Sequence, residues 1–167
     1  MTYDWPLYFC LFLALWSAVI AGVFSAFSEF VMSALIKTQN PGGIEAMQHI
    51  NRDVIKTQFA AGIVAIAIFS ILFALYGLAV FEGAPRTAIL LAAGIYLPGV
   101  FMMTMFGSVP MNNRLESLDH SSEQACIYWR EYGQKWTRLN HVRAVGSVLT
   151  AGLYLIAAIA LIASGQV

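Results

Sequence analysis

Four long apolar stretches divide the chain, and the short polar segments between them carry nearly all of the charge. The uncharged stretches are 24, 25, 27 and 24 residues long and cover residues 5–28, 57–81, 87–113 and 144–167. About 20 apolar residues are enough to cross a bilayer as an α-helix. The pattern therefore predicts an all-α integral membrane four-helix bundle, a single domain over residues 1–167, with spans at about residues 6–34, 57–81, 87–110 and 141–165.

The segment after the first span has the pattern of a short amphipathic helix. Residues 40–43 read Asn-Pro-Gly-Gly, which is typical of a turn. Beyond them Ile44, Met47, Ile50 and Val54 recur at intervals of three or four, which gives one apolar stripe. We expect this helix to lie on the membrane surface or to cap the bundle.

Two further features concern the third and fourth spans. Pro98 lies inside the third apolar stretch, where its missing amide donor and its clash with the preceding turn predict a kink. From Ser122 to the end of the chain no strong helix breaker occurs. The fourth helix is therefore expected to begin well before the membrane and to carry a long cytoplasmic extension.

Composition and charge narrow the function. Hydrophobic residues make up 59% of the chain and charged residues 11%, the mean hydropathy is +0.71 and the net charge is zero. A chain without a basic surface gives no sign of nucleic-acid binding. The two cysteines, Cys10 and Cys126, are predicted near opposite membrane faces and have no metal-ligand spacing.

The distribution of basic residues predicts the orientation. Apart from Arg86, every Lys and Arg lies in the two long loops or at the span ends beside them: Lys37, Arg52, Lys56, Arg114, Arg130, Lys135, Arg138 and Arg143. Such a bias marks the cytoplasmic side. We therefore expect both long loops in the cytoplasm and both termini outside.

This orientation gathers the informative polar residues at one face. Glu29 lies within apolar sequence near the end of the first span. A carboxylate inside a membrane suggests a functional site. A Glu at a helix end can also reach interfacial water or pair with an Arg. The third span ends with Asn112, Asn113 and Arg114, which provide donors at the inner mouth of the bundle or simply end the helix.

The fourth helix adds aromatic and charged residues at the same face. Trp129 and Trp136 belong to an aromatic stripe, which is as typical of a packed core as of a binding site, and Asn140, His141 and Arg143 follow at the entrance of the span. In the amphipathic helix His49, Asn51, Arg52 and Asp53 fall outside the apolar stripe, where such residues are commonly solvated.

Four segments together resemble the anthrone oxygenase family of small four-span membrane proteins, which has fungal and many bacterial members. They are Ala21–Met32, Ala46–Arg52, Val109–Leu115 and Trp136–Arg143. The resemblance implies oxidation of an anthrone to an anthraquinone by molecular oxygen. It also makes a bacterial inner membrane the expected location. His49 departs from the family pattern, whereas His141 matches its motif.

The expected chemistry needs a base, donors for a developing oxyanion and a flat apolar slot, and it needs no cofactor. We expect His141 to act as the base, with Glu29 as its orienting partner or as a second base, so that replacing His141 by alanine removes most turnover. The expected catalytic residues are His141, Glu29 and Arg143. The expected substrate-binding residues are Asn51, Arg52, Asn112, Asn113, Arg114, Trp129, Trp136 and Asn140.

Three alternatives stay open at this stage. His49, His141 and Glu29 could form a 2-His-1-carboxylate metal site, although their spacing carries no ligand signature. The protein could bind a lipid-soluble quinone or polyketide without converting it. It could also be a structural partner of another membrane protein, or form a homo-oligomer, through its small-residue stripes. The expected partners are a hydrophobic small molecule and membrane lipid.

Overall fold

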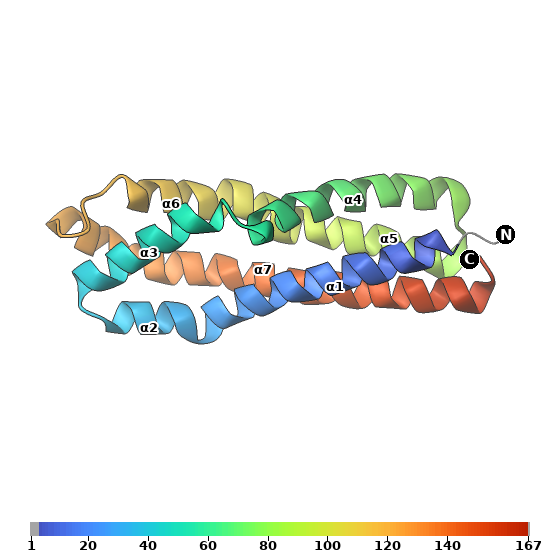
Figure 1. Ribbon diagram of the computed structural model, residues 1–167, viewed down its shortest axis with the longest axis horizontal. Helices are drawn as coiled ribbons and strands as arrows, with labels where there is room; N and C mark the ends of the chain where they lie inside the picture. Colours follow the sequence, from blue (N-terminus) through green and yellow to red (C-terminus); the bar gives the residue numbers. More distant parts are fainter. Residues whose placement is uncertain (1–3, 167) are drawn as a thin grey trace.

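The computed structural model describes residues 4–166. Within this part of the chain, four helical rods are long and apolar enough to cross a membrane: Trp5–Lys37, Gln58–Val80, Gly83–Glu116 and Glu123–Ser164. They run side by side along one axis, and the start of the first rod and the end of the last lie at the same end (Figure 1). The predicted four-span helical bundle is confirmed.

The first rod changes its helical geometry between residues 27 and 31. It consists of α1 (Trp5–Ala26), a π-helical segment η1 (Phe27–Val31) and α2 (Met32–Lys37). In η1 the hydrogen-bond ladder is wider, and the backbone N–H of Met32 donates to the carbonyl of Phe27, five residues back. Such wide turns displace neighbouring carbonyls from the regular α-helical ladder.

The amphipathic helix α3 (Asn40–Val54) follows. The prediction of a turn at residues 40–43 is wrong, because α3 already begins at Asn40. Pro41 lies in its first turn, where a missing N–H costs nothing. The predicted amphipathic pattern is confirmed, since Ile44 and Met47 are buried and His49 is exposed.

The second and third rods form a hairpin. It comprises α4 (Gln58–Val80), α5 (Gly83–Tyr96), the π-helical segment η2 (Leu97–Ser108) and α6 (Val109–Glu116). Pro98 lies in the first turn of η2, so the distortion expected there takes the form of an extended π-helix.

The fourth rod is the single helix α7 (Glu123–Ser164), 42 residues long. Ser122 caps it, and its hydroxyl accepts a hydrogen bond from the backbone N–H of Ala125 at 3.1 Å. A helix of this length measures about 63 Å, roughly twice the hydrocarbon thickness of a bilayer. The predicted extension of the fourth helix is confirmed.

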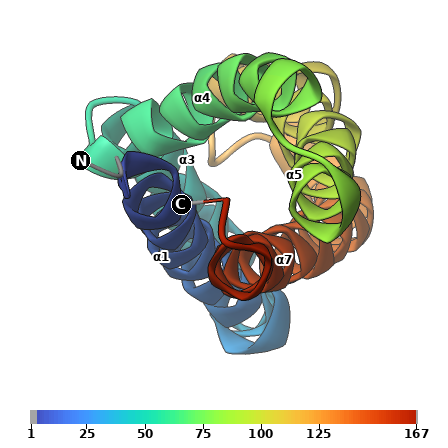
Figure 2. The same cartoon turned by 90° about the vertical axis from the view of Figure 1, so that its right-hand side faces the viewer.

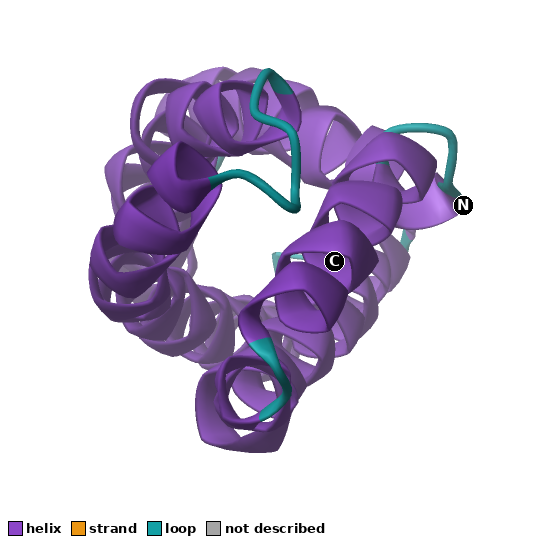
Figure 3. Ribbon diagram, turned by 90° about the vertical axis from the view of Figure 1, so that its left-hand side faces the viewer, coloured by secondary structure: helices purple, strands orange, loops and turns teal. Residues whose placement is uncertain are grey.

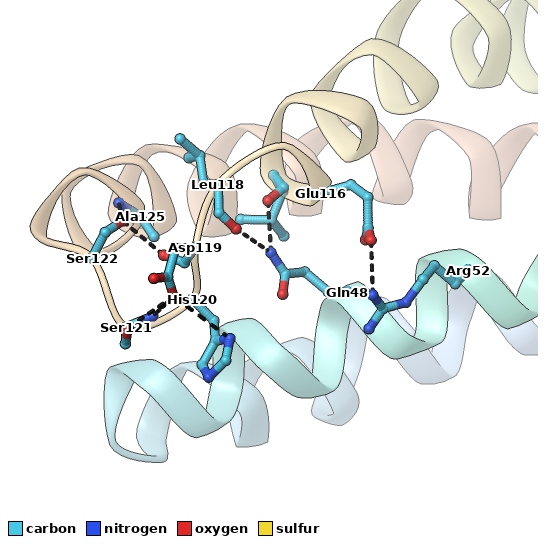
Figure 4. Close-up of polar contacts among 10 residues, drawn as sticks. Gln48, Arg52, Glu116, Leu118, Asp119, His120, Ser121, Ser122 and Ala125 are labelled. Atoms are coloured by element: carbon cyan, nitrogen blue, oxygen red, sulfur yellow. Dashed lines mark hydrogen bonds and ion pairs between the residues drawn. The ribbon is translucent and has the colours of Figure 1, made fainter.

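The rods enclose two hydrophobic cores. One runs along the spans, and the other lies at the end of the bundle where α3, α6 and the start of α7 meet. Figure 2 shows α4 across the bundle from α7, with α1 and α5 on the two sides, and Figure 3 shows the opposite end. There Gln48 of α3 donates hydrogen bonds to the carbonyls of Leu115 (2.8 Å) and Leu118 (2.9 Å) at the end of α6 (Figure 4). This contact holds α3 against α6 and closes that end of the bundle.

Candidate functional site

A cavity of about 370 Å³ lies between the rods beside α3. Its wall is largely apolar and comes from five parts of the chain: the end of the first rod, α3, the start of α4, η2 with α6, and α7. The polar residues in the wall are Asn51, Thr104, Ser108, Asn112, Asn140 and Arg143. The volume is within the range of small-molecule sites.

Arg143 is the one residue of the cavity wall that carries a formal charge, among the described residues 4–166. It is 4% exposed, and its guanidinium lies 4.4 Å from the ring centre of Phe24 and 5.1 Å from that of Trp136. Its Nη2 donates to Oδ1 of Asn140 at 2.8 Å. The two aromatic faces and the amide oxygen hold the cation in place without neutralising its charge.

Asn140 links this cation to the first rod. Its Nδ2 donates to the carbonyl of Phe24 at 2.6 Å and to Oγ of Ser28 at 2.7 Å. The accepting carbonyl lies just before η1, where the helical ladder changes. Asn140 is fully buried, so removing its amide would take the donor away from two acceptors on the first rod and the acceptor away from Nη2 of Arg143 on α7.

Three buried polar atoms of the cavity wall have no hydrogen-bond partner within the described residues: Nε of Arg143, Nδ2 of Asn51 and Oγ of Ser108. Leaving such an atom unpaired typically costs about 1–3 kcal/mol. No ion pair to Arg143 occurs within residues 4–166 either. A cation beside an apolar slot suits a flat ligand with an anionic or strongly accepting oxygen.

Asn112 positions the aromatic wall. Its Oδ1 accepts hydrogen bonds from the hydroxyl of Tyr132 at 2.8 Å and from Nε1 of Trp136 at 3.0 Å. Tyr132 stacks between Trp129 (5.5 Å, 15°) and Trp136 (6.1 Å, 21°). Trp136 lines the cavity, but Trp129 is buried in the neighbouring core and does not reach it. The structure therefore places Trp136, but not Trp129, where a ligand in this cavity could stack.

His141 and Glu29 lie elsewhere. Both are exposed and line a separate shallow groove of about 260 Å³ between the first rod and α7. Successive α-helical residues are about 100° apart, so His141 and Arg143 point about 200° apart around α7. The structure therefore brings His141 and Glu29 together in one groove and places Arg143 in the separate cavity.

Three of the other expected binding residues also lie outside the cavity. Arg52 forms an ion pair with Glu116 at 3.0 Å, as Figure 4 shows. The guanidinium of Arg114 covers the ring of Tyr128 at 4.1 Å. Asn113 is exposed. These side chains hold the end of the bundle together or face outward. Of the expected site, the structure brings together Asn51, Asn112, Trp136, Asn140 and Arg143.

Sequence reasoning missed Phe24 and Ser108 as parts of the site. Ser108 lies four residues before Asn112 and therefore on the same helical face, a signal that was present in the sequence. Phe24 belongs to an apolar run in which nothing distinguishes a cavity residue from a lipid-facing one.

The alternative metal site finds no support in the arrangement of the side chains. His49 is exposed on α3, whereas Glu29 and His141 lie in the groove between the first rod and α7. Between residues 4 and 166, no three His, Cys, Asp or Glu side chains lie close enough to hold a metal ion.

Comparison with known proteins identifies one family. The family model described as anthrone oxygenase matches residues 52–153, more than half of the chain. The matched region contains Ser108, Asn112, Trp136, Asn140 and Arg143. Neither a curated protein nor a solved structure matches the chain.

Proposed function

This chain belongs to the anthrone oxygenase family, and we propose that its cavity binds a flat aromatic ketone or phenol of the anthrone or quinol type and oxidises it with O₂. The family assignment supports an oxygenase-like membrane protein. The observation that carries the finer proposal is the buried cation of Arg143, which has no anionic partner within the described residues and lies in a largely apolar cavity.

The proposed reaction balances with the organic substrate and oxygen alone. An anthrone carries a methylene group between two aromatic rings, and loss of one proton gives a delocalised enolate. The enolate passes one electron to O₂, and the resulting radical and superoxide combine to a hydroperoxide at the methylene carbon. Loss of water leaves a carbonyl there, so one oxygen atom enters the product and the other enters water. The substrate itself supplies the electrons, with no cofactor.

Arg143 has the main role in this proposal. The negative charge of the enolate lies largely on its oxygen, and a fixed cation in a water-poor cavity stabilises that charge more than bulk water would. Asn51 of α3 and Ser108 of η2 add polar side chains to other walls of the cavity. The rings of Phe24 and Trp136 form parts of the wall against which a flat substrate can pack.

The residues that line the cavity include no carboxylate and no imidazole within the described chain. Catalysis then rests on lowering the free energy of the enolate, so the substrate loses its proton to water at the membrane surface and binds in the cavity as the anion. His141 and Glu29 are not needed in this scheme, because they lie on the other side of α7.

We also propose the orientation that the basic residues indicate. The α3 end would face the cytoplasm of a bacterial inner membrane, and both termini would lie outside. The cavity would then lie near the cytoplasmic boundary of the hydrocarbon layer. Labelling of single cysteines placed at residues 45 and 84, in intact cells and in inverted vesicles, tests this arrangement.

An oxygen-electrode measurement tests the reaction. The protein in lipid nanodiscs is given 1,8-dihydroxyanthrone, and oxygen uptake is compared with the spontaneous rate in empty nanodiscs. We expect catalysed uptake of one O₂ per anthraquinone formed, lost in Arg143→Gln and kept in Arg138→Gln, which changes an exposed arginine of the same helix. Binding without catalysed uptake would favour the alternative of a non-catalytic binder.

A further inference from the structure

The cavity has one wall that faces outward from the bundle. Three of its lining residues are strongly exposed, namely Ile55 (72%), Val64 (44%) and Met105 (42%). They come from three different places, just after α3, the second turn of α4, and η2. All three are apolar. We call the gap that they frame the lateral opening.

The lateral opening lies on the lipid side of the molecule. Val64 is six residues into α4, about 9 Å along the helix axis from Gln58. The neighbouring exposed residues of α4 are Ile68, Ile71 and Leu72, which have the apolar character of a lipid-facing surface. On the α4 side the opening is therefore framed by residues suited to acyl chains, whereas Ile55 lies between the exposed charges of Asp53 and Lys56.

The charged residue of the cavity, Arg143, is on the far side from α4. Arg143 and Asn140 belong to α7, and Figure 2 shows α7 across the bundle from α4. A ligand whose oxygen meets Arg143 therefore extends its apolar part toward the lateral opening. The cavity holds about 370 Å³, so a longer hydrocarbon tail would have to leave it, and Val64 and Met105 are the exposed lining residues of α4 and η2.

From this geometry we infer that the cavity takes an amphiphile that reaches it from the bilayer, with an anionic aromatic head at Arg143 and an alkyl tail that passes through the lateral opening into the lipid. The inference rests on the proposed function for the type of head group. The new element is that the cavity accepts substrates with long alkyl tails, whereas a closed cavity of this volume would reject them. It does not depend on whether the bound molecule is oxidised.

Binding of two air-stable probes tests the inference without relying on turnover. They are 2-hydroxy-1,4-naphthoquinone, which is anionic at neutral pH, and its 3-decyl derivative. Quenching of tryptophan fluorescence in nanodiscs reports binding, with lipid concentrations corrected for partitioning. Loss of the signal in Trp136→Phe assigns it to the cavity. We expect wild-type protein to bind both probes, and Arg143→Gln to bind both more weakly.

A matched pair of variants tests the path of the tail. Val64→Phe narrows the lateral opening, whereas Ile71→Phe enlarges a side chain of almost equal exposure (43%) two turns along α4, outside the cavity. We expect Val64→Phe to weaken binding of the decyl probe by about tenfold or more, and that of the tailless probe by much less. Ile71→Phe should change neither.

The outcomes separate the two proposals. If wild-type protein binds the tailless probe and rejects the decyl probe, or if Val64→Phe weakens both probes equally, the lateral opening is not the path of the tail. Retained binding of the tailless probe shows that a variant is folded. Tail-dependent binding without oxygen uptake would support this inference and overturn the proposed oxidation.

Discussion

Replacing Arg143 by glutamine removes the only formal charge in the described cavity wall while keeping a hydrogen-bonding side chain of similar reach. In the structure Nη2 of Arg143 is used by Asn140, and Nη1 makes no hydrogen bond within the described residues, so the guanidinium can donate to a bound oxygen from Nη1 without giving up an existing contact. A hydrogen bond to a charged group contributes about 1.5–3 kcal/mol. The affinity for an anionic ligand should therefore fall by roughly 10-fold to 100-fold.

The assay compares an anion with a neutral analogue. Fluorescence titration in nanodiscs gives Kd for 2-hydroxy-1,4-naphthoquinone and for its methyl ether, in wild-type protein and in Arg143→Gln. We expect a large loss for the anion and a small one for the ether, because only the anion uses the charge. Arg143→Lys keeps the charge but not the planar fork and should fall in between. Equal affinity of Arg143→Gln and wild-type protein for the anion would refute the assigned role, and unchanged thermal unfolding would show that the variant is intact.

Three further predictions follow from particular contacts. His141→Ala and Glu29→Gln should each change binding and oxygen uptake by no more than about threefold, since substitutions of exposed residues outside a site have small effects. Loss of turnover in either variant would instead support the role as base that was first expected for His141. Asn112→Leu leaves the buried hydroxyl of Tyr132 and Nε1 of Trp136 without their acceptor and should destabilise the fold by about 2–5 kcal/mol in thermal unfolding. Substitution of the exposed neighbour, Asn113→Leu, should be nearly neutral, and equal effects of the two variants would argue against the role of Asn112 in holding the aromatic residues. A Cβ at Gly146 would lie 3.1 Å from Cγ2 of Val100, so Gly146→Val should lower the unfolding temperature through an overpacking cost of about 1–3 kcal/mol, and Gly152→Val, with nothing within 4 Å, serves as the control that should not.

Much of the fold could be predicted because the bilayer imposes a simple rule. Backbone polar groups in hydrocarbon must be bonded within the segment, so each uncharged stretch of sufficient length becomes a helix. The extension of α7 could be predicted from the absence of breakers after Ser122, and the amphipathic face of α3 from the spacing of Ile44 and Met47. The start of α3 at Asn40 could not, because Pro41 is as compatible with the first turn of a helix as with a loop.

The candidate site was predicted less completely. Asn140 and Arg143 are three residues apart and share a helical face, so their joint position followed from the sequence. His141 lies between them and points away, which the same periodicity already implied. Arg52 and Arg114 resemble Arg143 in type and in nearness to the membrane. Only the structure shows that Arg52 forms an ion pair with Glu116 and that Arg114 lies over the ring of Tyr128.

The sequence by itself determined the number of spans, the clustering of polar residues near one face and the family, because these depend on local hydrophobicity and on motifs in the chain. Tertiary structure decided which polar groups meet. It set Arg143 between Phe24 and Trp136, separated Glu29 and His141 from the cavity, and left an apolar gap beside Val64. The reason is physical: local periodicity fixes the face of a helix on which a side chain lies, whereas the rotation and packing of neighbouring helices fix what that face contacts.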